Sequence, residues 1–223
     1  SFGNKSDVSE SDILHYLLYD KDTKVILVYI EDVKSGREFL KIAKKVTVKK
    51  PVVVIKSGRS AAGARAAASH TGAIAGSDKI YDAAFEQGGI IRARDMEEFF
   101  DIGKALAMQP PAMGKNIGIL TDAGGPGVMT VDECEALGLT VEHFSDETLK
   151  KFQALKDKDV ILKIAATNNP VDLTGSVTDE MFEVSAELMF QDPKIHGIIL
   201  LGLHHMPGLR EKYIDGIVKI SQK

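Results

Sequence analysis

The chain has 223 residues, which is longer than most single domains and favours two of them. Its net charge of −4 at pH 7 argues against binding to nucleic acid or to a membrane through bulk electrostatics. The longest apolar runs, VILVYI and PVVVI, are far too short to span a bilayer. The single cysteine, Cys134, excludes an internal disulfide and a multi-cysteine metal site, and its helix-like surroundings favour a buried thiol.

The N-terminal sequence SFGNKSDVSE has neither the basic nor the apolar part of a signal peptide. We therefore expect a cytoplasmic protein. The sequence does not start with methionine, so we also expect the chain to begin inside a larger protein.

Apolar β-branched runs alternate with amphipathic stretches, and this alternation predicts βα units with parallel sheets. Ser9 or Ser11 is expected to cap the first helix. The strand at 24–30 is almost continuously apolar, as expected when both faces of a strand are buried. The predicted elements of the first unit, residues 1–107, are helix 9–20, strand 24–30, helix 35–46, strand 51–58, helix 78–88, strand 89–93 and helix 95–107.

Residues 108–115 contain two consecutive prolines and a glycine without periodicity, which predicts a linker. The second unit, residues 116–223, ends on a helix with no strand after it. An open sheet that finishes on a surface helix and a chain cut before a final strand both fit this pattern. The predicted elements are strand 116–125, helix 126–138, strand 139–144, helix 145–155, a loop region through NNPVDLTG, helix 178–191, strand 195–203 and helix 208–223.

A glycine cluster, TDAGGPG at residues 121–127, lies between a strand and a helix of the second unit. Glycines let backbone amides approach a ligand, and a helix start offers unpaired N–H groups at the positive end of the macrodipole. The cluster therefore predicts a phosphate site, with an ordinary tight turn as an equal alternative. It matches neither the nucleotide P-loop nor the G-x-G-x-x-G pattern.

The stretch ASHTGAIAGSD, residues 68–78, surrounds His70 with small residues, so another surface can come close to it. A lone histidine is more often structural than catalytic. A histidine that attacks phosphorus needs a neutral, oriented imidazole, and a carboxylate on its other ring nitrogen supplies both. Glu31 directly follows the strand at 24–30, and the His70 loop follows the next strand, so both are expected at the same carboxyl edge. The alternative for Glu31 is a solvated loop acid, which spacing alone favours.

The remaining polar candidates carry less weight. His204 and His205 follow a strand and could form a metal set with Asp172, but no ligand spacing supports this, and a polar loop is favoured. Arg59 and Arg65 flank the His70 loop, where they either meet an anion or lie in solvent.

Three stretches resemble a known family. KPVVVIKSGRSAAGARAAASHTGAIAGSD is similar to the phosphohistidine segment of the ADP-forming acyl-CoA synthetases, which are relatives of succinyl-CoA synthetase. The sequence from residue 1 to 31, including the acid that ends the strand, resembles the start of the same domain. NIGILTDAGGPGVMTVDECEALGL, with the later NNPVDLTG, resembles the other ligase domain of the family. The resemblance covers essentially the whole chain.

The resemblance implies two flavodoxin-like, three-layer, parallel-sheet domains, with the phosphohistidine loop in residues 1–107. It implies that His70 is the phosphorylated residue and that Glu31 is the carboxylate that orients it. The phosphate-binding residues that it implies are Gly72 in the first domain and Gly124, Gly125 and Gly127 at the helix start of the second.

The implied reaction converts acyl-CoA, ADP and phosphate reversibly into the acid, ATP and CoA. The CoA-binding domain and the ATP-grasp nucleotide domain of the family are not in this sequence, so we expect a fragment or a split subunit. The last domain of the family would continue through further strands, so we expect residues 116–223 to be truncated at the C-terminus. Its partners would be an ATP-grasp subunit, a CoA-binding domain and a small-molecule acid, in a hetero-oligomer without nucleic acid or membrane. Mg²⁺ would accompany ADP or ATP on the partner, and CoA would be a substrate; no metal site is expected in this chain.

Two other functions fit parts of the pattern. Similar domains are fused to protein lysine acetyltransferases, where they resemble ligand-sensing modules that do not catalyse a reaction. A sensing module has no need of His70 together with Glu31, and both are present here. The third interpretation is a flavodoxin-like phosphate-binding module without turnover.

Overall fold

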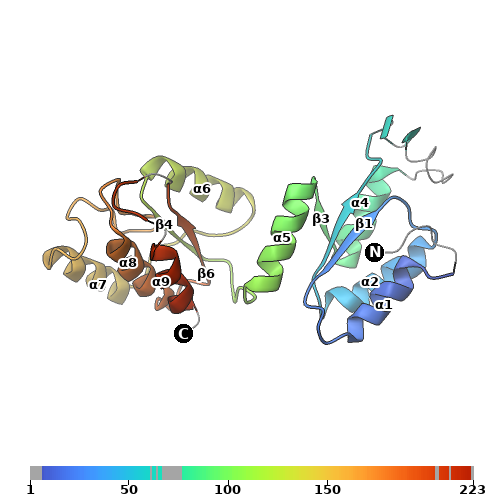
Figure 1. Ribbon diagram of the computed structural model, residues 1–223, viewed down its shortest axis with the longest axis horizontal. Helices are drawn as coiled ribbons and strands as arrows, with labels where there is room; N and C mark the ends of the chain where they lie inside the picture. Colours follow the sequence, from blue (N-terminus) through green and yellow to red (C-terminus); the bar gives the residue numbers. More distant parts are fainter. Residues whose placement is uncertain are drawn as a thin grey trace. The chain divides into compact units, whose positions relative to one another are not determined.

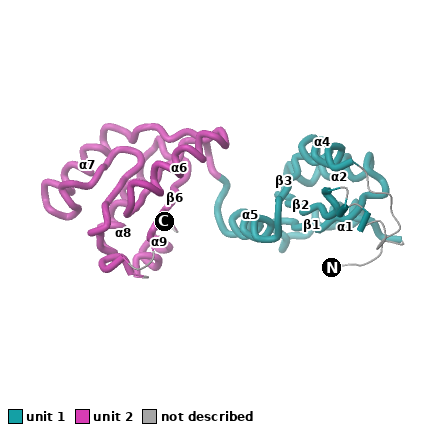
Figure 2. Tube along the Cα trace, turned by 90° about the horizontal axis from the view of Figure 1, so that it is seen from above, with its two compact units in different colours: residues 1–111 teal, residues 112–223 magenta. Residues whose placement is uncertain are grey.

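The computed structural model describes residues 7–60, 62–63, 65–66, 77–203, 206–210 and 212–221. The chain divides into two compact units, residues 1–111 and 112–223 (Figure 2). Each unit is built on a three-stranded parallel sheet, which confirms the predicted α/β class. Within the described ranges no helix is long and apolar enough to cross a membrane.

The first unit has the strand order β1-β2-β3, with helices on both faces of the sheet (Figure 1). One apolar cluster joins the sheet to α1, α2 and α4, and a second cluster joins the opposite face to α5. The elements are α1 (Glu10–Tyr19), β1 (Ile26–Ile30), α2 (Gly36–Thr47), β2 (Val52–Lys56), α4 (Asp78–Gly88), β3 (Ile91–Ala93) and α5 (Met96–Met108).

The two longer strands of this sheet differ in burial. All five residues of the central strand β2 are buried. In β1, Leu27 is 39% exposed and Tyr29 is 57% exposed, so the expectation that both faces of this strand are buried is wrong. The reason is that β1 is an edge strand: the apolar cluster under α5 is formed mainly with β2 and β3 and leaves these two side chains partly uncovered.

The start of α1 shows how local sequence sets a boundary in this unit. Ser9 is the N-cap: its hydroxyl accepts a hydrogen bond from the Asp12 amide at 3.3 Å, and its own amide donates to Asp12 Oδ2 at 2.9 Å. This reciprocal capping box satisfies two amides that the helix cannot pair internally. Of the two serines considered from the sequence, Ser9 is therefore the cap.

The second unit has the strand order β5-β4-β6, with α6 on one face of the sheet and α7, α8 and α9 on the other (Figure 1). Side chains of the central strand β4 alternate between the faces: Ile117 and Ile119 face α6, whereas Leu120 joins the cluster under α8. The elements are β4 (Ile117–Thr121), α6 (Gly124–Ala136), α7 (Asp146–Asp157), β5 (Val171–Asp172), α8 (Asp179–Phe190), β6 (Gly197–Leu201) and α9 (Lys212–Ser221).

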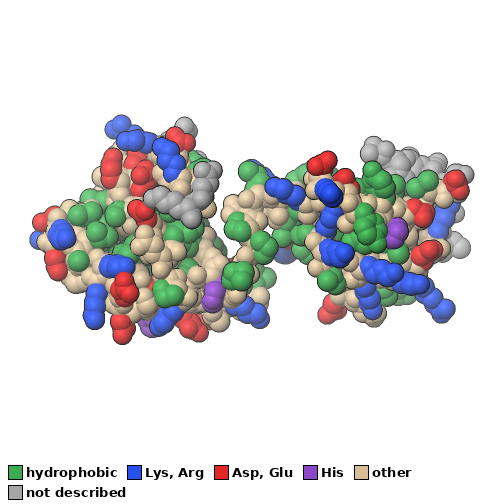
Figure 3. Space-filling model, turned by 90° about the horizontal axis from the view of Figure 1, so that it is seen from below, with side chains coloured by type: hydrophobic (Ala, Val, Ile, Leu, Met, Phe, Trp, Pro, Cys, Tyr) green, Lys and Arg blue, Asp and Glu red, His purple; other side chains and the backbone are tan. Residues whose placement is uncertain are grey.

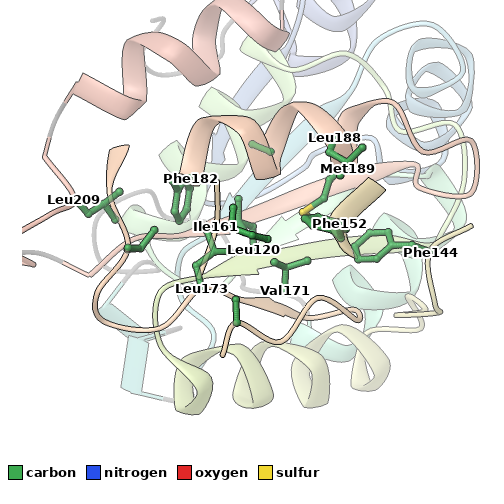
Figure 4. Packing of buried hydrophobic residues seen from close by; sticks show 13 residues of the cluster. Leu120, Phe144, Phe152, Ile161, Val171, Leu173, Phe182, Leu188, Met189 and Leu209 are labelled. Carbon is green, nitrogen blue, oxygen red and sulfur yellow. The ribbon is translucent and has the colours of Figure 1, made fainter. Parts of the chain in front are cut away.

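The larger core of the second unit lies between the sheet and the helices α7, α8 and α9 (Figure 4). Phe144 and Phe152 pack with their ring centroids 5.9 Å apart. Phe182 of α8 is fully buried, and its ring centroid lies 4.9 Å from that of Tyr213 on α9. On the other face, Cys134 of α6 is buried at 4% exposure.

The predicted strand at 139–144 does not form. Only a single bridge joins Thr140 to Asn116. The following backbone groups bond to side chains instead: the Glu142 amide donates to Asn116 Oδ1 at 2.8 Å, and the Glu142 carbonyl accepts from Asn169 Nδ2 at 2.9 Å. Two asparagines thus satisfy groups that a neighbouring strand would otherwise pair, and the segment stays outside the sheet.

Acidic and basic residues both lie on the face of each unit that Figure 3 shows. This distribution agrees with the modest net charge of −4.

Candidate functional site

The carboxyl edge of the first sheet brings Glu31 next to the start of the segment that carries His70. Because β1 and β2 are parallel, their carboxyl ends lie together, and the Ser57 amide donates to the Ile30 carbonyl at 3.0 Å. Glu31 follows directly and is half-buried, with the Tyr29 hydroxyl 3.4 Å from its Oε1. His70 and Gly72 lie outside the described residues, so their predicted roles stay predictions.

The helix that follows the same segment is also bonded to the turn after β1. Helix α4 begins at Asp78 and carries Tyr81 in its first turn. The Tyr81 hydroxyl donates to Asp32 Oδ1 at 2.8 Å, and the Val33 amide lies 3.3 Å from the same hydroxyl oxygen, which accepts its hydrogen bond. The strand before the His70 segment and the helix after it are therefore both bonded to residues 30–33.

A buried lysine ends β2 at this edge. Lys56 is 3% exposed, its ammonium donates to the Ser57 carbonyl, and its Nζ lies 4.7 Å from the centroid of the Tyr81 ring. Burial lowers the pKa of Lys56, while the nearby carboxylates of Asp78, Asp32 and Glu31 oppose the shift and the guanidinium of Arg92 adds to it. Lys56 was not among the residues predicted from the sequence, although a lysine at the end of an otherwise apolar strand can indicate a buried polar site.

Arg92 of β3 ties the start of α4 to the sheet. Its Nη2 lies 2.6 Å from Asp78 Oδ1, and its Nη1 bonds Asp82 one turn later. Burial disfavours the charged guanidinium, but the bonds to both acids outweigh this and raise the pKa of Arg92. Arg59, considered from the sequence as an anion contact, donates to the Arg94 carbonyl at 3.0 Å.

The carboxyl edge of the second sheet presents the start of α6. Gly124 and Gly125 are the first two helical residues, and the N-cap residue, Ala123, makes no side-chain cap bond. A Cβ on Gly125 would meet nothing within 4 Å. A Cβ on Gly127 would lie 3.0 Å from Thr121 Cγ2, so Gly127 lets the helix pack closely on β4. The first amides of α6 therefore have no capping side chain.

Two carboxylates border this helix start, and backbone amides bond each of them. Both oxygens of buried Asp122 accept from the Leu203 amide, at 3.2 and 3.1 Å. Asp172 Oδ1 accepts from the Thr174 amide at 2.8 Å. A Cβ on Gly124 would lie 3.0 Å from Asp172 Oδ2, so only glycine fits there without displacing the carboxylate.

Two residues of the metal set considered from the sequence with Asp172, His204 and His205, lie outside the described residues, so this set stays an interpretation of the sequence. Within the part of the chain that the structure describes, no group of three or more His, Cys, Asp or Glu side chains could hold a metal ion. His196 has a structural contact instead, since its Nδ1 accepts from the Asn116 amide at 3.1 Å.

Two family models match the chain in the same order as the two units. A succinyl-CoA ligase like flavodoxin domain matches residues 1–106, and a ligase-CoA domain matches residues 117–209. The two units are therefore of the succinyl-CoA ligase like flavodoxin type and the ligase-CoA type, in that order.

The α subunit of ADP-forming acetate–CoA ligase I from Pyrococcus furiosus is 44% identical over 203 residues, which cover 90% of this chain and 42% of that protein. The α subunit of ligase II from the same organism is 41% identical over 201 residues, which cover 90% and 43%. A solved relative from Ca. Korarchaeum cryptofilum, a dinucleotide forming acetyl-coenzyme A synthetase in complex with phosphate and ADP, has a TM-score of 0.87 and 32% identity over 96% of this chain and 46% of its own.

The chain therefore corresponds to the α-subunit-like region of the ADP-forming acetyl-CoA synthetases, which confirms the resemblance found in the sequence. It spans less than half the length of these relatives.

Proposed function

We propose that the chain is the phosphohistidine-bearing part of a nucleoside-diphosphate-forming acyl-CoA synthetase. One observation carries this proposal: the residues directly before the segment containing His70 and the helix directly after it are both bonded to residues next to Glu31. The Ser57 amide is bonded to the Ile30 carbonyl before the segment, and Tyr81 is bonded to Asp32 after it. A carboxylate at the base of such a segment is suited to orient an imidazole within it.

The reaction would proceed in three balanced transfers. Phosphate attacks the thioester carbonyl of acyl-CoA, the C–S bond breaks, and acyl phosphate and the CoA thiolate form. A ring nitrogen of His70 then attacks phosphorus, the P–O bond to the acyl group breaks, and the acid leaves as a carboxylate. Finally, a β-phosphate oxygen of ADP takes the phosphoryl group from His70, which gives ATP and the free imidazole. Each transfer is reversible.

Glu31 would accept a hydrogen bond from the second ring nitrogen of His70. This bond holds the proton on that nitrogen and leaves the other one free as the nucleophile. Gly72, in the same segment, would contribute to the phosphate site. The first domain, residues 1–107, would in this way carry the covalent step, and residues 108–115 would link it to the second.

The second domain, residues 116–223, would bind the phosphoryl group with the start of α6. The amides of Gly124 and Gly125, together with the helix dipole, favour an anion there, and the lack of a side-chain cap supports this role. Gly127 would permit the close packing that holds this helix end on β4.

Binding of the nucleotide and of CoA is assigned to partners. The two Pyrococcus furiosus relatives are α subunits, which supports a partner subunit in a hetero-oligomer. The ATP-grasp nature of this partner and the CoA-binding domain follow from the family resemblance. ADP and phosphate in the solved relative support the nucleotide and the anion as ligands of the assembly. From the family resemblance, we assign Mg²⁺ to the nucleotide on the nucleotide-binding partner.

Phosphohistidine formation tests the proposal. The chain is mixed with an authentic nucleotide-binding partner and γ-labelled ATP, and an acid-labile, base-stable label is measured. We expect His70→Ala to abolish the label and Glu31→Gln to slow its formation. His15→Ala is the matched control, because His15 is exposed on α1 and should keep the label. If an active partner leaves the wild-type chain unlabelled, the ligase role fails and the ligand-sensing function replaces it.

A further inference from the structure

The contacts around Tyr81 connect three elements at the edge of the first sheet. Its ring lies over the ammonium of Lys56 at the end of β2, and its hydroxyl reaches Asp32 and Val33 in the turn after β1. Its own helix, α4, follows the His70 segment. A single side chain thus joins both ends of that segment to the turn that carries Glu31.

The Tyr81 hydroxyl is held as a permanent donor. Burial is the main cause that raises the pKa of Tyr81 to about 12, and the bond to Asp32 adds to it. The phenol therefore keeps its proton at neutral pH and donates to the Asp32 carboxylate, while its lone pair accepts from the Val33 amide. Both bonds restrain the residues that directly follow Glu31.

Lys56 places a positive charge beneath the same ring. Its ammonium is buried, donates to the Ser57 carbonyl and faces the π-surface of Tyr81. An ammonium over a tyrosine ring is attracted by the negative face of the ring, and this attraction resists rotation of the side chain. The ring also contacts Phe85, at 5.8 Å between centroids. Two contacts therefore hold the Tyr81 ring whose hydroxyl bonds the turn.

We infer that Tyr81 is a positioning residue for Glu31: held over Lys56, it bonds Asp32 and Val33 and so fixes the turn that presents the Glu31 carboxylate. The inference rests on the proposed function, in which Glu31 orients His70. Tyr81 does not touch the reacting atoms in this role; it acts only through the turn. Loss of its hydroxyl should slow phosphoryl transfer to His70 without weakening the affinity for the nucleotide-binding partner.

Tyr81→Phe is the informative variant, because it keeps the ring over Lys56 and against Phe85 and removes one oxygen atom. Tyr16→Phe is the matched control, since Tyr16 is 69% exposed on α1. Hydrogen exchange first tests the geometry. The Val33 amide should exchange about tenfold faster in Tyr81→Phe than in the wild type, and at the wild-type rate in the control. Rapid-quench labelling with γ-labelled ATP then measures the rate at which His70 is phosphorylated.

We expect Tyr81→Phe to lower that rate between about tenfold and 100-fold at saturating partner and ATP, as a misplaced catalytic group does. A double-mutant cycle with Glu31→Gln distinguishes positioning from general destabilisation. If Tyr81 acts through Glu31, removing its hydroxyl has little further effect once Glu31 is replaced. Equal rates in Tyr81→Phe and Tyr16→Phe, or fully additive effects with Glu31→Gln, would overturn the inference.

The same experiment separates this inference from the function on which it rests. A wild-type chain that is labelled, beside a Tyr81→Phe chain labelled at the same rate, refutes the role of Tyr81 alone. A wild-type chain that an active partner does not label refutes the proposed function and, with it, the role of Tyr81.

Discussion

Asn169 should be a principal source of stability in the second unit, because its side chain replaces a missing stretch of strand. Strand β5 pairs with β4 only at Leu120 and Thr121. Beyond it, Asn169 Oδ1 accepts from the Ile119 amide at 2.9 Å, and Nδ2 donates to the Ile117 carbonyl at 2.7 Å. A third bond runs from Nδ2 to the carbonyl of Glu142. One amide side chain therefore satisfies three backbone groups.

The cost of removing that side chain follows from these three bonds. Each hydrogen bond contributes about 1 kcal/mol net, and a buried group left without a partner costs about 1–3 kcal/mol. Ile119 is fully buried and Ile117 is 7% exposed, so water cannot easily replace the lost partner. We expect Asn169→Ala to lower the free energy of unfolding of the second unit by about 3 kcal/mol.

Urea titration of the whole chain, read by hydrogen exchange in peptides that cover β4, measures this value for the second unit alone. With a urea slope of about 1–3 kcal/mol per molar, the midpoint should fall by about 1–3 M. Asn168→Ala is the control, because the neighbouring Asn168 is exposed. Asn169→Asp keeps the volume, loses both donors and places a carboxylate against the carbonyls of Ile117 and Glu142, so its instability would report these polar contacts rather than a cavity. A loss below about 1 kcal/mol in Asn169→Ala would refute the reasoning.

Two further predictions concern backbone space and pH. In Gly208→Ala the new Cβ would lie 2.2 Å from the Val177 carbonyl oxygen, so we expect a loss of about 2 kcal/mol or more in the same titration. In Gly138→Ala the new Cβ would meet nothing within 4 Å, and only the φ of +78° strains it, so the free energy of unfolding should fall by about 1 kcal/mol. Equal losses in Gly208→Ala and Gly138→Ala would contradict the contact argument. The pH titration of near-ultraviolet absorbance, taken as the difference between the wild type and Tyr81→Phe, should show the ionisation of one phenol with a midpoint at about pH 12. Because the folded pKa of Tyr81 is raised from 10.0, its stabilising effect should be complete below pH 10.0 and disappear toward pH 12; a midpoint near 10.0 would contradict the burial argument.

The elements that local sequence determines were predicted well. Helix α4 has the bounds predicted for it, and α1 begins after Ser9 because the capping box lies within four consecutive residues. The apolar run of β2 lies within the strand predicted at 51–58. The strand predicted at 139–144 failed because the bonds that replace its ladder come from Asn116 and Asn169, which are distant in sequence. The two-residue strand β5 is too short to leave a pattern.

For the site as well, only features that are local in the sequence could be predicted. A strand that ends in an acid and a strand that ends in glycines pointed to Glu31 and to the start of α6, because both signals are local. The contacts that fix the turn after Glu31 are not local. Tyr81 lies 49 residues from Asp32, and a tyrosine on an amphipathic helix is typical of an ordinary core position.

Only the fold reveals why such a residue matters at this edge. A parallel sheet places the carboxyl ends of neighbouring strands side by side. The helix α4, which follows the His70 segment, therefore starts close to the turn after β1. The residues that flank the segment are bonded to this turn, through Ser57 before it and Tyr81 after it. In the proposed relay, the precision needed to orient an imidazole would come from buried Lys56, from Tyr81 and from the hydrogen-bonded turn, all of which lie outside the segment that carries the reacting group.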